Sequence, residues 1–240
     1  EWRWRGRFEW RTADTEDKWN LYSGLYRQLD EADTLGGSLR WQQRDGSNGA
    51  QDITATLQLD YAHRPDDGRL ILLNQAQYVV DRRLDAQNDL DGQRLVNNLH
   101  ANWRFDDRNE LGMQYAAKYV FDTIDAARYK GYTDIVGLEL RHDLTETWDV
   151  GARTSRLQSW RAGVGEQSYG VFVGYSPVRN VWLSLGYNFR GFRDDDFAGA
   201  EYRDQGFNLA FRLKFDQDDV AGAAARWQST RSSLPPPRED

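Results

Sequence analysis

The chain of 240 residues contains no cysteine, one methionine and five prolines. The absence of cysteine excludes disulfide frameworks and thiolate metal sites. The chain also lacks any run of about 20 apolar residues, which a membrane-spanning helix would require. The formal net charge of −7 argues against a general nucleic-acid binder, so no nucleic-acid partner is expected.

Aromatic residues are abundant for so polar a chain, which has 10 Trp, 12 Tyr and 10 Phe beside 29% charged residues. A disordered protein would lack these aromatics. A transmembrane β-barrel reconciles the two features, because only half of each strand faces lipid while the lumen half stays polar. Its aromatics form girdles at the membrane interfaces.

Strict alternation of apolar and polar residues is clearest at the two ends of the chain. In Phe207–Phe215 every second residue is a large apolar one, and the residues between are Asn, Ala, Arg and Lys. In Glu1–Arg11 the alternation sets Trp, Gly and Phe against Arg and Glu. A period of two places the two sets on opposite faces of a β-strand. A lipid-facing outside and a water-filled inside satisfy both rows.

Twelve segments of this kind are expected, an even number, as in bacterial single-chain barrels. The predicted fold is all-β: a closed transmembrane antiparallel up-and-down β-barrel of about 12 strands, occupying residues 1–216. A soluble barrel or sandwich is the alternative, since a single alternating strand suits either. Repeated hairpin units follow tight turns, and each contains an apolar residue and then an inward glycine, as in Asn109–Tyr115 and Val181–Tyr187.

The connections between strands are predicted to alternate in length. Long acidic loops are expected at Asp81–Arg94 and Asp122–Gly131, and a β-bulge within Arg69–Val80, where the phase of the alternation blurs. Short periplasmic turns and longer extracellular loops produce such a difference, which places both chain ends on the periplasmic side. The predicted turns are Asp30–Gly37, Pro65–Gly68, Asp106–Asn109, Leu144–Thr147 and Pro177–Asn180.

Residues 217–240 differ from the rest, with an Ala-rich run followed by the proline triplet Pro235–Pro237, which cannot enter a strand. They are expected to form a flexible periplasmic tail. The chain begins inside a predicted strand, which is interpreted as the start of a mature or excised segment.

The alternation assigns each strand residue to a face. The lipid-facing set comprises Trp2, Trp4, Trp10, Leu183, Leu185, Tyr187, Phe207, Leu209, Phe211, Leu213 and Phe215. The lumen-lining set of basic residues comprises Arg3, Arg5, Arg7, Arg11, Arg40, Arg104, Arg153, Arg190, Arg212 and Lys214.

These inward basic residues have two interpretations. Focused potential in a narrow pore would make the lumen attract anions. Alternatively, they form a solvated wall, paired with Glu9, Asp60, Asp134 and Asp149. A twelve-strand barrel is narrow, and long Arg side chains that cross it can close it.

No catalytic residue, metal site or cofactor is expected. The three histidines, His63, His100 and His142, do not have metal-ligand spacing. The acidic stretches Asp85–Asp91 and Asp194–Asp196 could bind calcium or bridge lipopolysaccharide through divalent ions, but they do not match an EF-hand and suit solvated loops. Outer-membrane phospholipases also have twelve strands, yet no nucleophile motif lies beside His142.

The last third of the sequence resembles the carboxy-terminal barrel of large bacterial outer-membrane surface proteins that carry repeat domains ahead of it. The resemblance rests on Val181–Phe197 (VWLSLGYNFRGFRDDDF) and Tyr202–Phe215 (YRDQGFNLAFRLKF), and covers Leu95–Phe215 best. Gly206–Phe215 is similar to the assembly signal by which the barrel-assembly machinery recognises a final strand. This similarity implies signal roles for Gly206, Phe211, Leu213 and Phe215. In that family the signal commonly ends the chain, whereas here about 25 residues follow it.

The resemblance implies a porin-like barrel in the outer membrane of the Gram-negative cell envelope that anchors, and helps export, a larger surface or periplasmic assembly. The alternative is a small diffusion channel with an Arg-lined, anion-favouring lumen. The expected partners are outer-membrane lipid and lipopolysaccharide, the barrel-assembly machinery, and a passenger or partner envelope protein.

Overall fold

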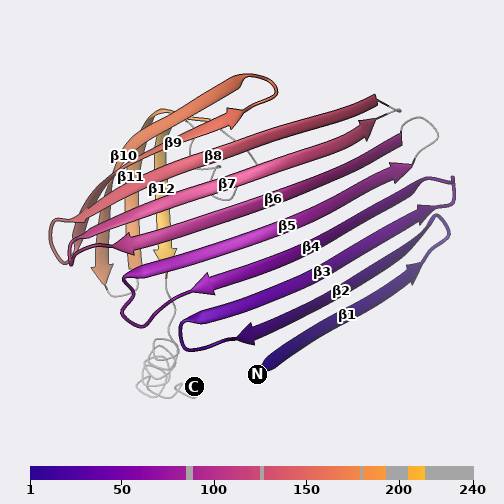
Figure 1. Cartoon of the computed structure of the whole chain (residues 1–240), viewed down its shortest axis with the longest axis horizontal. Helices are drawn as coiled ribbons and strands as arrows, with labels where there is room; N and C mark the ends of the chain where they lie inside the picture. Colours follow the sequence, from indigo (N-terminus) through magenta and orange to yellow (C-terminus); the bar gives the residue numbers. More distant parts are fainter. Residues whose placement is uncertain (85–88, 125–126, 179–180, 193–204, 214–240) are drawn as a thin grey trace, which may run out of the picture.

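The computed structural model describes residues 1–84, 89–124, 127–178, 181–192 and 205–213. They form a single antiparallel sheet of twelve strands, in which each strand pairs with its neighbours in sequence (Figure 1). The predicted all-β, twelve-stranded up-and-down arrangement is therefore confirmed. The strands are β1 (Trp2–Thr12), β2 (Glu16–Gln28), β3 (Asp33–Gly46), β4 (Gln51–His63), β5 (Leu70–Leu84), β6 (Asp89–Arg104), β7 (Asn109–Ile124), β8 (Ala127–Asp143), β9 (Trp148–Ser159), β10 (Val164–Val178), β11 (Val181–Arg190) and β12 (Gly206–Leu213).

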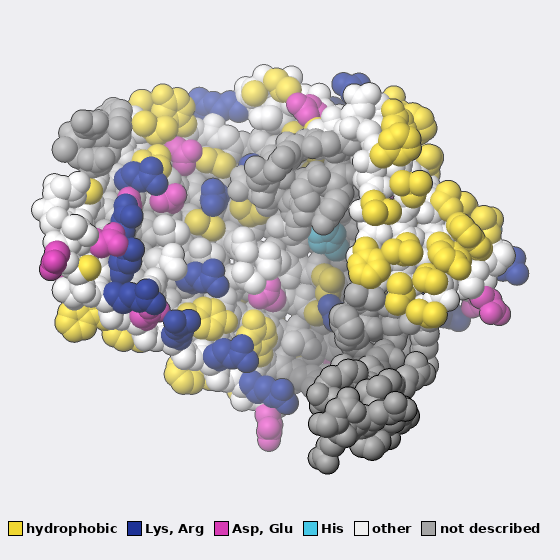
Figure 2. Space-filling view, turned by 180° about the vertical axis from the view of Figure 1, so that it is seen from behind, with side chains coloured by type: hydrophobic (Ala, Val, Ile, Leu, Met, Phe, Trp, Pro, Cys, Tyr) yellow, Lys and Arg dark blue, Asp and Glu magenta, His cyan; other side chains and the backbone are white. Residues whose placement is uncertain are grey.

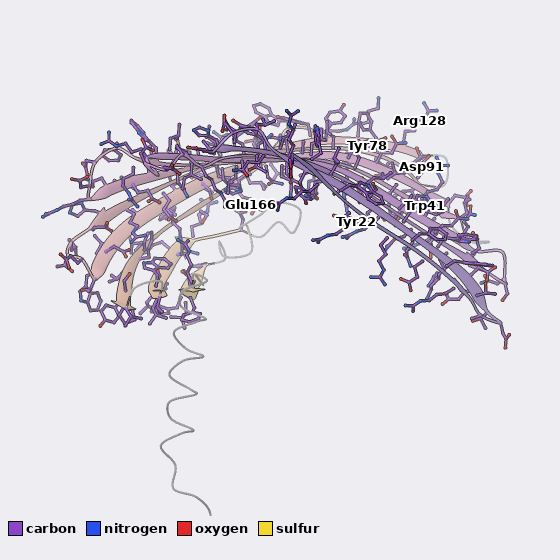
Figure 3. The ribbon with its side chains drawn as sticks, turned by 90° about the horizontal axis from the view of Figure 1, so that it is seen from below. Tyr22, Trp41, Tyr78, Asp91, Arg128 and Glu166 are labelled. Carbon is purple, nitrogen blue, oxygen red and sulfur yellow. The ribbon has the colours of Figure 1, made fainter. Side chains whose placement is uncertain are left out.

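The sheet bends into an arch with a concave and a convex face. Figure 3 places Tyr22 and Glu166 under the arch and Arg128 on its outer side. Residues paired across strands point to the same side of a sheet, so the register carries these two faces through all twelve strands. The convex face is apolar and aromatic, and its large side chains are exposed, as with Trp4 (71%) and Leu209 (74%). The concave face is polar.

The two edges of the sheet are β1 and β12. Within the described ranges β1 pairs only with β2, and β12 pairs only with β11. Figure 3 shows that the two ends of the arch stand apart, with the strands near β12 more strongly curled. Closure of the sheet into a cylinder therefore stays a prediction. No helix among the described residues is long and apolar enough to cross a membrane.

A small hydrophobic core lies on the concave side. Val96, Ala116 and Ile135 come from the adjacent strands β6, β7 and β8, and Phe192, which follows β11, packs with them. Ile135 and Ala116 are fully buried. This contact brings the chain after β11 onto the concave side of β6–β8, so the curl of the last strands is supported by packing.

The predicted long acidic loops are wrong. β5 continues to Leu84 and β6 starts at Asp89, so only residues 85–88 separate them. Likewise β7 and β8 approach within two residues, 125–126. A strand that is solvated on both faces needs no apolar alternation, so polar, acidic sequence does not by itself indicate a loop. The connections at this end of the sheet are therefore short, and it is the strands of the hairpins that are long.

The first predicted turn, Asp30–Gly37, is also too long, because β3 starts at Asp33. Gly36 belongs to the strand and not to the turn. A Cβ atom at Gly36 would lie 2.7 Å from Cε1 of Tyr26 on β2, so the missing side chain leaves room for the tyrosine ring. Glycine in a strand can mark close approach of a neighbour as well as a turn.

The bulge predicted within Arg69–Val80 is absent, because the ladders of β5 with β4 and β6 run without a register shift. The shifts occur instead between β10 and β11, at Tyr169/Gly170 and at Tyr175/Val178. The apolar run that blurred the phase has a simple origin. Leu70 and Leu72 face the convex side with Trp103 and Ala101, while the residues between them face the concave side.

Short turns at the other end of the hairpins are closed by side-chain oxygens. Asp30 Oδ1 accepts hydrogen bonds from the backbone N–H groups of Ala32 (2.9 Å) and Asp33 (2.7 Å). Thr145 Oγ1 does the same for residues 147 and 148. In the turn Pro65–Gly68, the Gly68 N–H donates to the Pro65 carbonyl and Gly68 has a φ of +60°, as predicted from the sequence. These local bonds set the register of each hairpin.

The turn between β6 and β7 allows the contribution of such side-chain-to-backbone hydrogen bonds to be tested. Asp106 Oδ1 accepts hydrogen bonds from the backbone N–H groups of Arg108 and Asn109, both at 2.8 Å. These bonds, led by that from Arg108, hold the pKa of the Asp106 carboxyl group below its ordinary value. A lowered pKa means stabilisation that is present above the unfolded-state pKa and is lost as the pH falls through the folded-state value.

We therefore expect Asp106→Ala to lower the urea midpoint of unfolding at pH 7 and to reduce its dependence on pH in the acid range. Urea unfolding at pH 7 and pH 3, followed by tryptophan fluorescence, measures both. Asp107→Ala, one residue along the same turn, is the matched control and should behave as wild type. Equal behaviour of the two variants would show that the Asp106 bonds do not stabilise the turn.

Candidate functional site: the polar concave face

The register places the predicted lipid-facing residues together on the convex face. Trp2, Trp4 and Trp10 lie there on β1, opposite Arg27, Leu25 and Trp19. Leu183, Leu185 and Tyr187 of β11 pair with Phe211, Leu209 and Phe207 of β12. Leu213 pairs with Val181 at the end of β12, and Phe215 lies outside the described residues. Contact with lipid, and the assembly-signal role of Gly206, Phe211, Leu213 and Phe215, stay predictions.

Most of the predicted lumen-lining residues lie together on the concave face. They are Arg3, Arg5, Arg7 and Arg11 on β1, Arg40 on β3, Arg104 on β6, Arg153 on β9 and Arg212 on β12. Arg190 differs: the register shift in β10 pairs it with the convex residue Tyr169, so the ladder does not assign it to the concave face. Lys214 lies outside the described residues.

Basic side chains concentrate on the concave face of β1–β3, and we call this set the basic strip: Arg3, Arg5, Arg7, Arg11, Lys18, Arg40 and Arg44. Figure 2 shows a row of Lys and Arg side chains along that part of the hollowed face. Acidic residues neutralise only some of them. Glu9 binds Arg7 (NH2–Oε2 2.9 Å) and Arg11, and Arg44 NH2 lies 2.8 Å from Asp52 Oδ2.

Arg3, Arg5 and Arg40 have no ion pair within the part of the chain that the structure describes. The cross-strand neighbours of Arg3 and Arg5 on β2 are Tyr26 and Gly24, and Arg40 lies between Tyr22 and Thr56. The expected pairing of the inward arginines with Glu9 therefore holds for Arg7 and Arg11 in the second half of β1. The positive charges of Arg3 and Arg5, nearer the start of the strand, stay uncompensated. This end of the concave face carries unbalanced positive charge.

Amide side chains fill the middle of the concave face, on β4 and β5. Asp60, one of the predicted acidic partners, accepts hydrogen bonds from Gln58 Nε2 (2.8 and 2.9 Å) and Gln75 Nε2 (3.2 Å) rather than from an arginine. Gln77 Nε2 donates to Gln58 Oε1 at 2.9 Å. These neutral polar groups present both donors and acceptors to water or solute.

A polar network occupies the concave side of β8–β12. Arg153 donates to Asn188 Oδ1 (3.1 Å) and to Asn208 Oδ1 (2.7 Å), linking β9, β11 and β12. Asp149, only 2% exposed, accepts a hydrogen bond from Trp182 Nε1 at 2.8 Å and pairs with Arg141 NH2 at 3.1 Å. A buried carboxylate needs such compensation, since an unpaired buried charge is strongly destabilising.

Inward glycines make room for this network. A Cβ atom at Gly174 would collide with the carboxylate of Asp149, and one at Gly186 would lie 2.6 Å from Asn208 Oδ1. The sequence pattern revealed an inward glycine in several repeated units. It did not show that the missing side chain lies opposite a polar partner on the adjacent strand.

Of the expected acidic partners, Asp149 pairs with Arg141, which is not one of the predicted lumen-lining residues. The prediction for Asp134 is wrong, because Asp134 lies on the convex face, where Trp160 Nε1 donates to its Oδ2 at 3.0 Å.

A cavity of about 520 Å³ opens beside the network. Its lining combines Glu139, Arg153 and Arg212 with Trp182 and with His100 from β6. The guanidinium of Arg212 lies 5.0 Å from the centre of the Trp182 ring, a cation–π distance. The curled end of the sheet therefore presents charged and aromatic groups to the same concave space as the basic strip.

Histidines and acidic residues are the side chains that metal sites and nucleophile–base pairs use. The described residues contain no group of three or more His, Asp or Glu side chains able to hold a metal ion. His142 Nδ1 lies 2.8 Å from Asn109 Oδ1 on the convex face, and its cross-strand neighbours are Asn109 and Val150. In the described strands neither position beside His142 offers a serine nucleophile.

The fold is similar to that of solved outer-membrane receptors and transporters. The siderophore receptor PirA from Pseudomonas aeruginosa aligns with 78% of this chain at a TM-score of 0.58 and 13% identity. The alcaligin outer membrane receptor FauA from Bordetella pertussis aligns with 78% at 0.51 and 14%, and the copper transporter OprC with 72% at 0.55 and 14%. The match spans only 36–37% of each of these chains.

These likenesses show the fold: this chain has the architecture of an outer-membrane β-barrel protein. No protein-family model matches it. No curated protein matches it either. The similarity is thus one of strand arrangement at low sequence identity, and the particular family expected from the sequence stays a prediction.

Proposed function

We propose that this chain resides in a bacterial outer membrane and forms the wall of a channel for small hydrophilic solutes, with a preference for anions. The convex face would contact lipid, and the concave face would line the path. The observation that carries the proposal is the basic strip, in which Arg3, Arg5 and Arg40 lack an acidic partner among the described residues. Uncompensated charge beside a low-dielectric wall focuses potential and raises the local concentration of counter-ions.

The polar remainder of the concave face supports the same use. The amide groups of β4 and β5 and the polar groups that line the open cavity beside Trp182 can form hydrogen bonds with a passing solute. OprC is a copper transporter and PirA a siderophore receptor, so a similar fold serves transport in at least one other protein. In lipid the free edges of β1 and β12 must also be paired, because unpaired backbone groups are costly there.

Conductance across planar lipid bilayers tests the proposal. Wild-type protein should give steps with anion-selective reversal potentials under a KCl gradient. The variant Arg3→Gln/Arg5→Gln/Arg40→Gln should lower the anion-to-cation permeability ratio by about twofold or more, because the focused positive potential is lost. A variant that removes convex charge, Arg27→Gln/Arg156→Gln, is the control and should keep the wild-type ratio.

Silent bilayers with folded protein would contradict the channel. Anchoring of a larger surface protein, the function expected from the sequence resemblance, requires the same lipid-facing wall but no conduction, and it stays a prediction. So do the partners expected with it, the barrel-assembly machinery and a passenger protein. The predicted boundary between barrel and tail, residues 1–216 and 217–240, falls outside the described residues.

A further inference from the structure

We propose that the convex face of β5–β8 binds a phosphorylated glycolipid of the outer leaflet, at the end of the sheet where β5 ends and β6 begins. The convex face is apolar over most of its area, but basic residues interrupt it here. One cross-strand row runs from Arg82 through Asp91 and Thr123 to Arg128. The next row contains Gln93, Phe121 and Lys130. Figure 3 shows Arg128 on the outer side of the arch, away from the concave path.

Free positive charge remains at this site. Arg82 NH2 lies 3.3 Å from Asp91 Oδ2, so these two side chains largely neutralise each other. Arg128 and Lys130 are exposed and form no ion pair within the described ranges. Lys130 Nζ lies 5.6 Å from the centre of the Phe121 ring, which holds the ammonium group over the apolar surface below it. Arginine and lysine so placed are the standard partners of phosphate oxygens.

The depth of these residues matches a lipid head group. At the opposite end of the convex face Trp103 and Phe105 pack together, with ring centres 5.6 Å apart, and mark one interface. Ten residues of β6 separate Trp103 from Gln93. At a rise of about 3.4 Å per residue and a tilt of about 40°, they span roughly 25 Å, the height of the lipid-facing band of such proteins. Asp91 and its row partner Arg128 lie about 5 Å further out, at the level of head-group phosphates.

A row of tyrosines lies at the edge of this lipid-facing band. Tyr78, Tyr119 and Tyr132 stand in one cross-strand row on β5, β7 and β8, just below Lys130. The hydroxyl of Tyr78 donates to Gln93 Oε1 at 2.8 Å, and that of Tyr132 lies 3.2 Å from the Tyr115 hydroxyl. Tyrosine with an apolar ring and a satisfied hydroxyl is typical of the membrane interface. The cations of the next two rows, Lys130 and Arg128, would therefore contact lipid head groups, and the tyrosine rings would contact acyl chains.

A hollow of about 250 Å³ lies at the two basic rows, lined by Asp91, Gln93, Phe121, Arg128 and Lys130 among others. The two uncompensated cations of this site, Arg128 and Lys130, are two residues apart on β8, or about 7 Å along the strand. A pair at this spacing can contact one sugar-linked phosphate from two sides, and the hollow beside the pair can hold part of the sugar. The β5–β6 and β7–β8 hairpins extend beyond the band at this end, which favours the outer side of the membrane, where the connecting segments of such barrels are longer.

Binding of diphosphoryl lipid A to the purified full chain in nonionic detergent, measured by microscale thermophoresis, tests the proposal. We expect Arg128→Gln/Lys130→Gln to weaken binding by about tenfold or more, because two charge-assisted contacts are lost. Arg128→Lys/Lys130→Arg keeps both charges and should bind within about threefold of wild type. Arg3→Gln/Arg5→Gln removes equal charge from the concave face and should bind as wild type does.

Two further titrations of the wild-type protein identify the ligand. Dephosphorylated lipid A should bind as weakly as lipid A binds to the glutamine variant. Vesicles of phosphatidylglycerol should bind more weakly than lipid A. The proposal is overturned if the glutamine variant keeps wild-type affinity, if the concave variant loses affinity equally, or if phosphatidylglycerol binds as tightly as lipid A. None of these readouts depends on conduction, so they stand apart from the channel experiment.

Discussion

The variant Leu57→Arg should lose about 2–4 kcal/mol of folding free energy in phospholipid vesicles, the cost of an arginine on the lipid face of a transmembrane barrel near the midplane. Leu57 lies on the convex face at the centre of β4, between Leu39 on β3 and Tyr78 on β5. Its side chain is 48% exposed. In a water-soluble protein, an arginine at so exposed a position would change stability by less than about 0.5 kcal/mol. Urea unfolding in vesicles, followed by tryptophan fluorescence, measures the difference.

Thr54→Arg is the matched control for this experiment. Thr54 lies on the same strand but on the concave face, where its neighbours are Gln42 and Asp81. A polar cavity of about 380 Å³, lined in part by Thr54 and Asp52, leaves space for the longer side chain. We expect its stability to remain close to that of wild type. If both variants were equally stable, the convex face would not be in lipid, and the membrane proposal would fail.

Gly170→Ala should destabilise the protein by about 3 kcal/mol, at the upper end of the usual cost of overpacking a tight site. A Cβ atom at Gly170 would lie 2.6 Å from the Tyr187 carbonyl oxygen and 3.0 Å from the Asn188 Cα atom, and it would collide with Asn188 Oδ1. Backbone atoms cannot rotate away. Asn188 is fully buried and accepts a hydrogen bond from Arg153, so its displacement would also disturb the polar network.

Gly131→Ala on β8 is the control for the added methyl group. No atom lies within 4 Å of a Cβ atom at Gly131, and its backbone is not in the left-handed region. Alanine there should leave the urea midpoint unchanged or raise it slightly, because it restricts the unfolded chain. Equal midpoints for the Gly170 and Gly131 variants would mean that β10 and β11 can separate at the bulge without cost.

The two glycines show why part of the site could not be read from the sequence. Both are concave glycines in strands, and nothing in the local pattern distinguishes them. The difference lies in what the neighbouring strand presents: Asn188 opposes Gly170, whereas Val120 pairs with Gly131. The Asp149–Arg141–Trp182 cluster has the same origin, since its members come from three different strands.

The prediction of the connections between strands was wrong for a related reason. Asp81–Arg94 is polar and acidic apart from Leu84, Ala86 and Leu90, a composition that predicts a loop. The cross-strand bonds that make Arg82 and Asp91 part of one ladder depend on the partner strand, which local composition does not reveal. The part of a strand that is solvated on both faces carries no signal of period two, because neither face meets an apolar phase.

The sequence by itself determined the number of strands and, where the alternation is unbroken, which residues of a strand share a face, because a period of two is a local property. It left the phase open in Arg69–Val80 and in the second half of Trp148–Trp160. It also determined that charge concentrates on the concave side of β1. The tertiary structure alone decided which charges are compensated, where glycines admit a polar network, and where basic residues emerge on the convex face. Those features depend on register between strands, and register is fixed by pairing across the sheet and not along the chain.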